Sequence, residues 1–104
     1  MLVHDLDILL VEDDPLDAEL MMTALKRWKD DTQIRLLTDG VEALDYIFAT
    51  GPFSDRKIES LPKVIFLDLK LPKLDGLEVL RRIRDDERTR EVPVVIFSSS
   101  HEDR

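Results

Sequence analysis

Cysteine is absent from this chain of 104 residues, which also has only three glycines and one tryptophan. Without cysteine the protein can form neither a disulfide framework nor a thiolate metal site. The sequence lacks any run of about 18 apolar residues, which excludes an ordinary membrane-spanning helix. Its first residues, MLVHDLD, lack the basic and long apolar regions of a signal peptide. We therefore expect a cytoplasmic protein that does not enter a membrane.

Basic residues are in the minority, with 15 against 23 acidic residues and a net charge of -8. This balance disfavours binding to nucleic acid or to an anionic membrane surface, and it favours cations and basic partners. The length allows one hydrophobic core, and a hydrophobic fraction of 43% suits a globular protein. We therefore expect residues 1–104 to form one domain.

Short apolar runs alternate with segments of helical periodicity along the chain. The runs are too short for helices and predict buried strands at 6–11, 33–38, 64–67 and 92–97. The periodic segments between them predict helices at 15–28, 41–48 and 77–83, and the polar stretch 51–62 predicts a surface loop. This order predicts an α/β fold with right-handed crossovers and a parallel sheet covered on both faces.

The first predicted helix has a clear start signal. Asp14 can cap it and Pro15 fits its first position. Apolar residues then recur at a four-residue spacing, with Met21 and Leu25 alongside, as an amphipathic helix requires; the series is Leu16, Leu20, Ala24 and Trp28.

Polar side chains follow three of the four predicted strands. Glu12 and Asp13 follow the first strand, Asp68 ends the third, and Ser98 follows the fourth. Ligand sites of open parallel sheets lie beyond the carboxyl ends of the strands, so we expect these side chains to share one cleft. Three carboxylates there would raise one another's pKa unless a cation intervenes. An all-oxygen set of this kind suits Mg²⁺.

A carboxylate beside such a metal can act as a nucleophile towards a phosphoryl group, and Asp68 is the best placed to do so. Ser98 could donate a hydrogen bond to the product. Each residue also has a structural interpretation. Asp13 or Asp14 can serve as a helix cap, and Asp68 and Ser98 can be turn residues. Their occurrence together after strands of one parallel sheet favours the functional interpretation.

Three motifs, ILLVEDDP, VIFLDLKLPKLDG and PVVIFSS, closely resemble the receiver domain of two-component response regulators. The loop before the third strand and the motif DLKLPKLDG look most like those of single-domain regulators of bacteriophytochrome-type kinases. The resemblance implies a flavodoxin-like, doubly wound parallel sheet with strand order 2-1-3-4. It also implies a phosphoacceptor switch in a phosphorelay, which is not a turnover enzyme.

The resemblance also implies a role for each site residue. Asp68 would accept the phosphoryl group from a phosphohistidine of a sensor histidine kinase or a phosphotransfer protein. Asp13 would bind Mg²⁺ directly and Glu12 through water, while Lys70 would offer its backbone carbonyl. Ser98 matches the switch hydroxyl and Ser99 the small residue beside it, and Leu71-Pro72 and Asp75-Gly76 would shape the loop after Asp68.

Receivers also have a fifth strand, two last helices and a lysine that pairs with the phosphoryl group, and these 104 residues stop before them. We therefore expect a truncated domain that lacks the fifth strand and most of the last two helices, with an open edge at the fourth strand. The chain could be a fragment of a larger assembly that supplies the missing part, or copies could pair with one another. We expect a homodimer or higher oligomer through residues 92–104, which would cover that edge.

Two alternatives to the switch stay open at this point. One is a receiver-like interaction or dimerisation module with impaired or no phosphotransfer, which the missing lysine favours. The other is an aspartyl phosphatase. Those enzymes usually have a second Asp two residues after the nucleophile, where this chain has Lys70.

Overall fold

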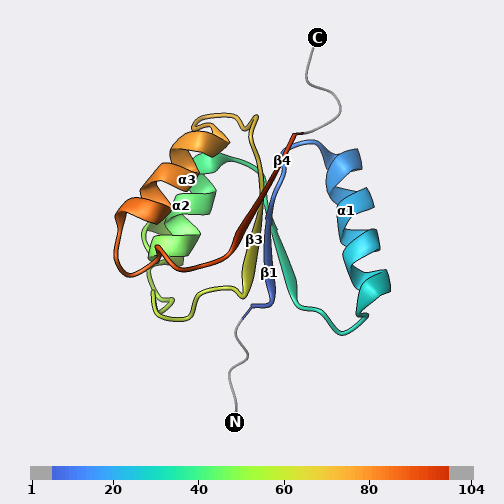
Figure 1. Cartoon of the computed structure of the whole chain (residues 1–104), viewed down its shortest axis with the longest axis horizontal. Helices are drawn as coiled ribbons and strands as arrows, with labels where there is room; N and C mark the ends of the chain where they lie inside the picture. Colours follow the sequence, from blue (N-terminus) through green and yellow to red (C-terminus); the bar gives the residue numbers. More distant parts are fainter. Residues whose placement is uncertain (1–5, 99–104) are drawn as a thin grey trace.

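The computed structural model describes residues 6–98, in which strands and helices alternate as predicted (Figure 1). Their order is β1 (Ile8–Val11), α1 (Pro15–Trp28), β2 (Ile34–Leu37), α2 (Gly40–Phe48), the 3₁₀ helix η1 (Gly51–Phe53), β3 (Val64–Asp68), α3 (Gly76–Asp85) and β4 (Val94–Phe97). None of the described helices is long and apolar enough to cross a bilayer.

The four strands form one parallel sheet in the order β2-β1-β3-β4. This is the α/β fold and the strand order that the receiver resemblance implied. All four residues of β1 are buried, as expected for a central strand with helices on both sides. β4 begins two residues later than the predicted run, after Pro93, which has no N–H to donate to a ladder.

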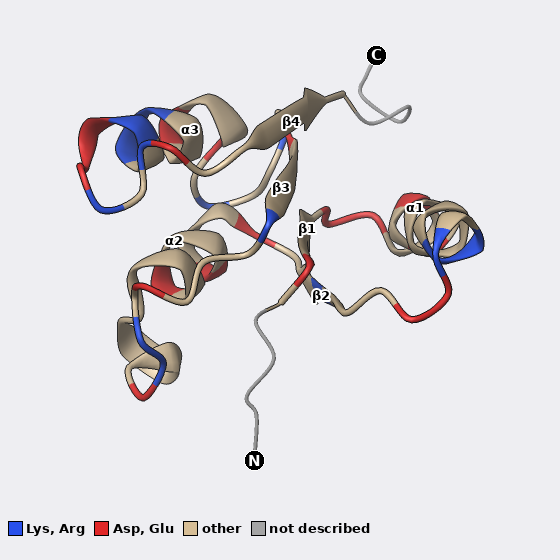
Figure 2. Ribbon diagram, turned by 60° about the horizontal axis from the view of Figure 1, so that its bottom comes forward, with Lys and Arg blue, Asp and Glu red and all other residues tan. Residues whose placement is uncertain are grey.

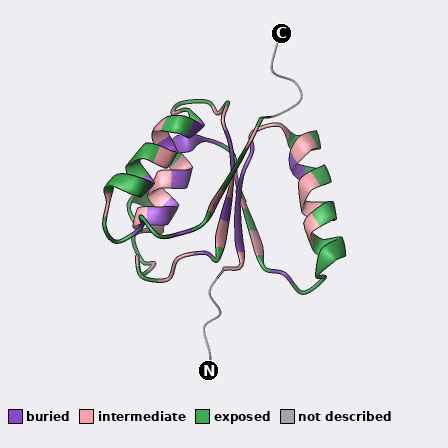
Figure 3. Ribbon diagram, in the orientation of Figure 1, coloured by how far each residue is buried: buried purple, intermediate pink, exposed green. Residues whose placement is uncertain are grey.

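The core lies between the sheet and the helices α2 and α3, which cover one face (Figure 3). Its buried members are apolar and come from three strands, both helices and the segment before β4: Leu9, Val11, Leu37, Ala43, Tyr46, Ile47, Ile65, Leu67, Val79, Ile83 and Val92. Asp39 and Asp75 cap α2 and α3 by accepting hydrogen bonds from Glu42 N and Glu78 N.

Of the helices within residues 6–98, only α1 covers the other face of the sheet, and here the sequence prediction needs a correction. Asp14 and Pro15 start the helix as predicted. The four-residue series points outward, however, with Leu16, Leu20 and Trp28 exposed by 64%, 61% and 81%. The buried or half-buried side instead contains Ala18, Met21, Met22 and Leu25, which have the i, i+3, i+4, i+7 spacing of one helix face, whereas a strict four-residue series drifts around the helix.

β4 is an outer strand of the described sheet, pairing with β3. Val95 and Ile96 are exposed by 43% and 36%, so this edge is only partly covered, as the sequence predicted. The predicted oligomer contact at 92–104 extends beyond the described residues, as does Ser99.

The polar loop at 51–62 is held against α2 by Arg56. Its guanidinium lies 3.9 Å from the centre of the Tyr46 ring and donates hydrogen bonds to the carbonyls of Tyr46 and Ser60. Phe53 of η1 packs edge-on against Tyr46, with ring centres 5.1 Å apart. Guanidinium stacking on aromatic faces therefore fixes a segment that has no periodic pattern of its own.

Candidate functional site

Three carboxylates meet at the carboxyl ends of β1 and β3. Val11 is paired with Leu67 in the parallel register, so Glu12 and Asp13 leave β1 beside Asp68, the last residue of β3. One oxygen of each carboxylate lies within 4.8 Å of the others. Figure 2 shows the acidic turn between β1 and α1 in red. The structure thus brings together the three acidic residues that the sequence placed at strand ends.

These carboxylates are buried to a degree that is unusual for acidic side chains. Glu12 and Asp68 are fully buried, and Asp13 is half-buried. The Asp14 amide donates to Glu12 Oε2 at 2.9 Å, and the Lys70 amide donates to Asp68 Oδ1 at 3.1 Å. Burial, as the largest cause, and the neighbouring Asp68 together raise the pKa of Glu12 to about 7, against the opposing effect of the Asp14 amide.

The cluster has the properties of a cation site. Within residues 6–98, Glu12 Oε1 and Asp13 Oδ1 are buried and have no hydrogen-bond partner. Buried polar atoms of this kind normally have a partner, and an unexplained one indicates a missing ion or water. Several carboxylate oxygens around one point suit a hard divalent cation such as Mg²⁺. The residues present therefore fit the predicted metal.

The loop after Asp68 is held tightly at its far end by Gly76. The Gly76 amide donates to the Leu69 carbonyl at 2.9 Å, and a Cβ at position 76 would lie 2.2 Å from the Asp68 carbonyl oxygen. A side chain there would have to displace the backbone of Asp68 itself. Glycine at this position lets α3 begin directly against the strand end that carries the central carboxylate.

Ser98 lies at the same edge of the sheet. Asp68 is paired with Phe97, and the Leu69 amide donates to the Phe97 carbonyl at 2.9 Å. Ser98 therefore follows β4 close to the level at which the chain leaves β3, and it is exposed.

An open hollow of about 580 Å³ adjoins the acidic cluster. Asp13 and Asp75 line it together with apolar residues of the loop and the start of α3: Leu69, Leu71, Pro72 and Leu77, with Lys70 beside them. A partner that approaches the carboxylates would meet this mixed surface.

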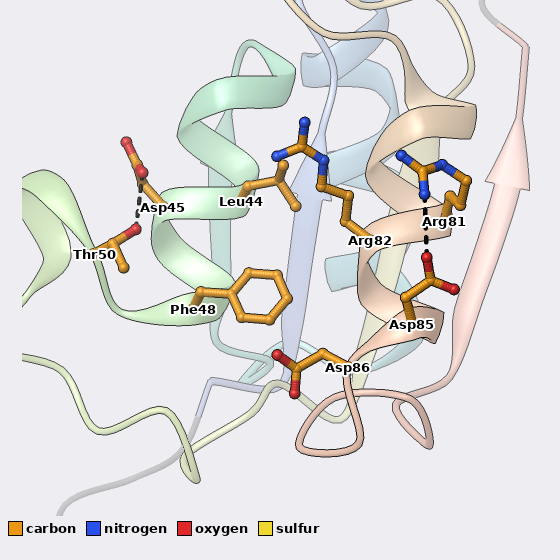
Figure 4. Close-up of a pocket in the computed structure, with 8 residues that line it drawn as sticks. All are labelled: Leu44, Asp45, Phe48, Thr50, Arg81, Arg82, Asp85 and Asp86. Atoms are coloured by element: carbon orange, nitrogen blue, oxygen red, sulfur yellow. Dashed lines mark hydrogen bonds and ion pairs between the residues drawn. The ribbon is translucent and has the colours of Figure 1, made fainter.

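A second groove, of about 590 Å³, lies between α2 and α3 (Figure 4), and its lining does not include Glu12, Asp13 or Asp68. Leu44 and Phe48 are half-buried and line it. Its arginines are matched by carboxylates: Arg81 pairs with Asp85 at 3.1 Å and Arg82 with Glu78 at 3.0 Å. Three aspartates and two arginines line the groove, and none of them belongs to the acidic cluster.

Asp39 and Gly40 are not among the residues that the sequence places at the site. In the structure both residues contact the loop after Asp68: Asp39 pairs with Lys73 at 3.5 Å, and the Gly40 amide donates to the Pro72 carbonyl at 3.3 Å. No spacing in the sequence indicates this long-range contact.

A parallel sheet of this order with clustered carboxylates at the ends of β1 and β3 defines the class of receiver-like α/β proteins. Residues 8–104 match the family described as the response regulator receiver domain. The chain belongs to this family.

Among curated proteins, the chain is similar to the probable methanogenesis regulatory protein FilR2 of Methanothrix harundinacea, with 44% identity over 92% of this chain and 59% of that protein. The response regulator Rcp1 of Synechocystis is 37% identical over 90% of this chain and 62% of that protein. The chain thus spans about three fifths of the length of these relatives.

Among solved structures, the bacteriophytochrome response regulator RtBRR superposes with a TM-score of 0.85 at 47% identity, over 95% of this chain and 59% of that one. The Mn²⁺-bound form of Rcp1 superposes with a TM-score of 0.80 at 36% identity, over 92% and 67%. The likeness to bacteriophytochrome regulators that the motifs indicated is therefore confirmed.

Proposed function

We propose that the chain is the phosphoacceptor domain of a two-component phosphorelay. In this proposal Asp68 accepts a phosphoryl group from a phosphohistidine on a sensor histidine kinase or a phosphotransfer protein in the cytoplasm. The observation that carries the proposal is the convergence of Glu12, Asp13 and Asp68 within 4.8 Å at the carboxyl edge of the sheet. Asp68 is phosphorylated and the acyl phosphate is later hydrolysed, so the domain acts as a switch and is not a turnover enzyme.

The transfer needs one nucleophilic oxygen in a fixed orientation. An Asp68 carboxylate oxygen attacks the phosphorus, the P–N bond of the phosphohistidine breaks, and the imidazole leaves with the electron pair. The product is an acyl phosphate on Asp68. The Lys70 amide, which donates to Asp68 Oδ1, holds the plane of the carboxylate. Ser98 is proposed as the hydroxyl that donates a hydrogen bond to the bound phosphoryl group.

The residues that would hold Mg²⁺ are Asp13 and Asp68 directly, Glu12 through water, and Lys70 through its backbone carbonyl. When bound, the ion supplies positive charge against the oxygens of the transferring group. Support comes from the buried oxygens of Glu12 and Asp13 described above. Further support comes from related proteins, whose structures are described as an Mn²⁺-bound Rcp1 and a phosphorylated RcpA.

Acetyl phosphate tests this function without a kinase. With Mg²⁺ present, the intact mass of the protein should rise by one phosphoryl group, and the Asp68→Asn variant should show no increase. Binding of Mg²⁺ without any phosphorylation would instead favour the interaction or dimerisation module. If the protein shows neither Mg²⁺ binding nor labelling, the proposal is wrong.

We also propose that two copies pair through the β4 edge, within residues 92–104. The outer position of β4 and the exposure of Val95 and Ile96 support this contact. Light scattering at micromolar concentration should show a dimer or higher oligomer, and a folded monomer would exclude the pairing.

A further inference from the structure

The loop between β3 and α3 rests directly on the start of α2. The Gly40 amide donates to the Pro72 carbonyl at 3.3 Å. A Cβ at position 40 would lie 1.9 Å from the Leu74 carbonyl oxygen and 2.8 Å from Leu74 Cβ. No side chain fits in that space, so any residue other than glycine must push the loop away from α2.

Lys73 gives the loop a strained turn at the same place. Its φ is 70°, in the left-handed region, and the Leu74 amide donates to the Pro72 carbonyl at 2.7 Å, which closes a three-residue γ-turn. A γ-turn with positive φ at a residue other than glycine persists only where its surroundings hold it.

Asp39 supplies a contact that can hold this turn. Its Oδ2 lies 3.5 Å from Lys73 Nζ, while its Oδ1 accepts a hydrogen bond from Glu42 N at 2.8 Å and so caps α2. The carboxylate is nearly buried, whereas Lys73 remains largely exposed. One side chain thus ties the turn of the loop to the first turn of the helix.

The same loop carries the groups nearest to the proposed phosphoacceptor. Lys70 donates its amide to Asp68 Oδ1, and Gly76 donates to the Leu69 carbonyl at the end of the loop. The loop is therefore anchored at Asp68 and Leu69 on one side and at α2 on the other. Because Gly40 binds the Pro72 carbonyl, only Leu71 separates the α2 contact from Lys70.

We propose that Asp39, Gly40 and Lys73 are positioning residues, which set the distance of the Lys70 backbone from Asp68 and thereby the affinity for Mg²⁺ and the rate of phosphorylation. This inference rests on the proposed function. An ion pair with one exposed partner adds little to overall stability. Its loss should therefore affect the site more than the fold.

The decisive comparison uses two glycine substitutions, one at the first residue of α2 and one at the first residue of η1. Gly40→Ala should weaken Mg²⁺ binding in calorimetry and slow acetyl phosphate labelling, each by about tenfold or more, because a displacement of about 1 Å at a reacting centre has effects of this size. Gly51→Ala is the matched control: Gly51 has a φ of 55°, and the three atoms nearest to its added Cβ belong to the Asp45 side chain, the closest at 3.0 Å. The control should lower the melting temperature and leave Mg²⁺ affinity unchanged.

A second set of variants keeps the test valid if Gly40→Ala does not fold. Asp39→Asn retains the capping oxygen and removes the charge, and Lys73→Ala removes the other partner. Each should weaken Mg²⁺ binding several-fold with little change in melting temperature. The double variant should bind Mg²⁺ no more weakly than either single variant, and Lys73→Arg should retain most of the wild-type affinity.

The outcomes distinguish a failure of this inference from a failure of the proposed function. If the wild-type protein neither binds Mg²⁺ nor becomes phosphorylated, the proposed function fails. If it does both, and folded Asp39→Asn and Lys73→Ala variants match it, only the positioning role is wrong. The positioning role is also excluded if Mg²⁺ affinity falls in proportion to melting temperature in every variant, including the control Gly51→Ala.

Discussion

Two regions of this protein are equally well buried and have opposite chemistry. Under α2 and α3, the fully buried side chains include Ile47, Leu67 and Ile83, which are apolar. At the carboxyl edge of the sheet, Glu12 and Asp68 are just as inaccessible but carry ionisable groups. Burial stabilises the first group and penalises the second when it is charged. The free energy gained by burying the apolar core under α2 and α3 therefore offsets the cost of burying the charged carboxylates.

The largest expected effect comes from removing a side chain of the apolar core under α2 and α3. Ile83→Ala should lower the free energy of unfolding by about 2–5 kcal/mol, because it removes a fully buried side chain and leaves a cavity. Urea unfolding followed by circular dichroism measures this. The matched control is Leu20→Ala on α1, where the side chain is 61% exposed and the change should stay below about 1 kcal/mol. If both variants lose the same free energy of unfolding, the difference in packing between the two sides of the sheet is contradicted.

The second effect is a pH dependence that arises at the acidic edge. The pKa of Glu12 is about 7 in the folded protein and near 4.5 when unfolded, so between these values the folded state binds more protons. Raising the pH through this window should therefore lower the free energy of unfolding, by up to about 3 kcal/mol, in the absence of metal. Urea unfolding in EDTA from pH 4.5 to pH 7 gives the measurement.

Glu12→Gln identifies the source of that slope, since its side chain cannot ionise. The wild-type protein should lose stability relative to this variant as the pH rises, and saturating Mg²⁺ should reduce the difference. Parallel curves for the two proteins would show that Glu12 is not the group responsible.

A third test compares the acidic edge with and without metal. Mg²⁺ at about one hundred times its dissociation constant should stabilise the wild-type protein by about 2.7 kcal/mol. Asp13→Asn should lose most of this gain, because it removes one of the carboxylates that would hold the ion. Thermal unfolding with Mg²⁺ or EDTA would measure the gain in each protein. A variant that is stabilised by Mg²⁺ as much as the wild type contradicts this view of the site.

The smallest effect concerns the start of α3, where the two regions join. Asp75→Ala removes the side chain that accepts from Glu78 N at 3.0 Å and should cost about 1 kcal/mol of stability. Asp75→Asn keeps a capping oxygen and should be nearly neutral. If both variants lose the same amount, the carboxylate has a role beyond the cap.

Much of the fold was predictable from local patterns in the sequence. Each short apolar run forms a strand of the sheet. Asp14 caps α1 as predicted, whereas the caps that Asp39 and Asp75 provide were not predicted. The rule that parallel strands bring their carboxyl ends together placed Glu12, Asp13 and Asp68 in one site, and the structure confirms their proximity.

The features that were missed depend on contacts between distant segments. The outward direction of Leu16, Leu20 and Trp28 follows from how α1 lies on the sheet, and helical periodicity alone does not fix that rotation. The contact of Asp39 and Gly40 with the loop at 69–75 joins residues about thirty positions apart. The pKa of Glu12 likewise depends on burial, which the sequence does not specify.

The most direct test of the central claim is to locate the phosphoryl group. The protein would be incubated with acetyl phosphate and Mg²⁺, the acyl phosphate reduced with borohydride, and the peptides examined by mass spectrometry. We predict that the aspartate at position 68, and not Asp13 or Asp14, is converted to homoserine, and that omission of Mg²⁺ abolishes the conversion. Conversion at another carboxylate, or none in a protein that binds Mg²⁺, would contradict the assignment of Asp68 as the phosphoacceptor.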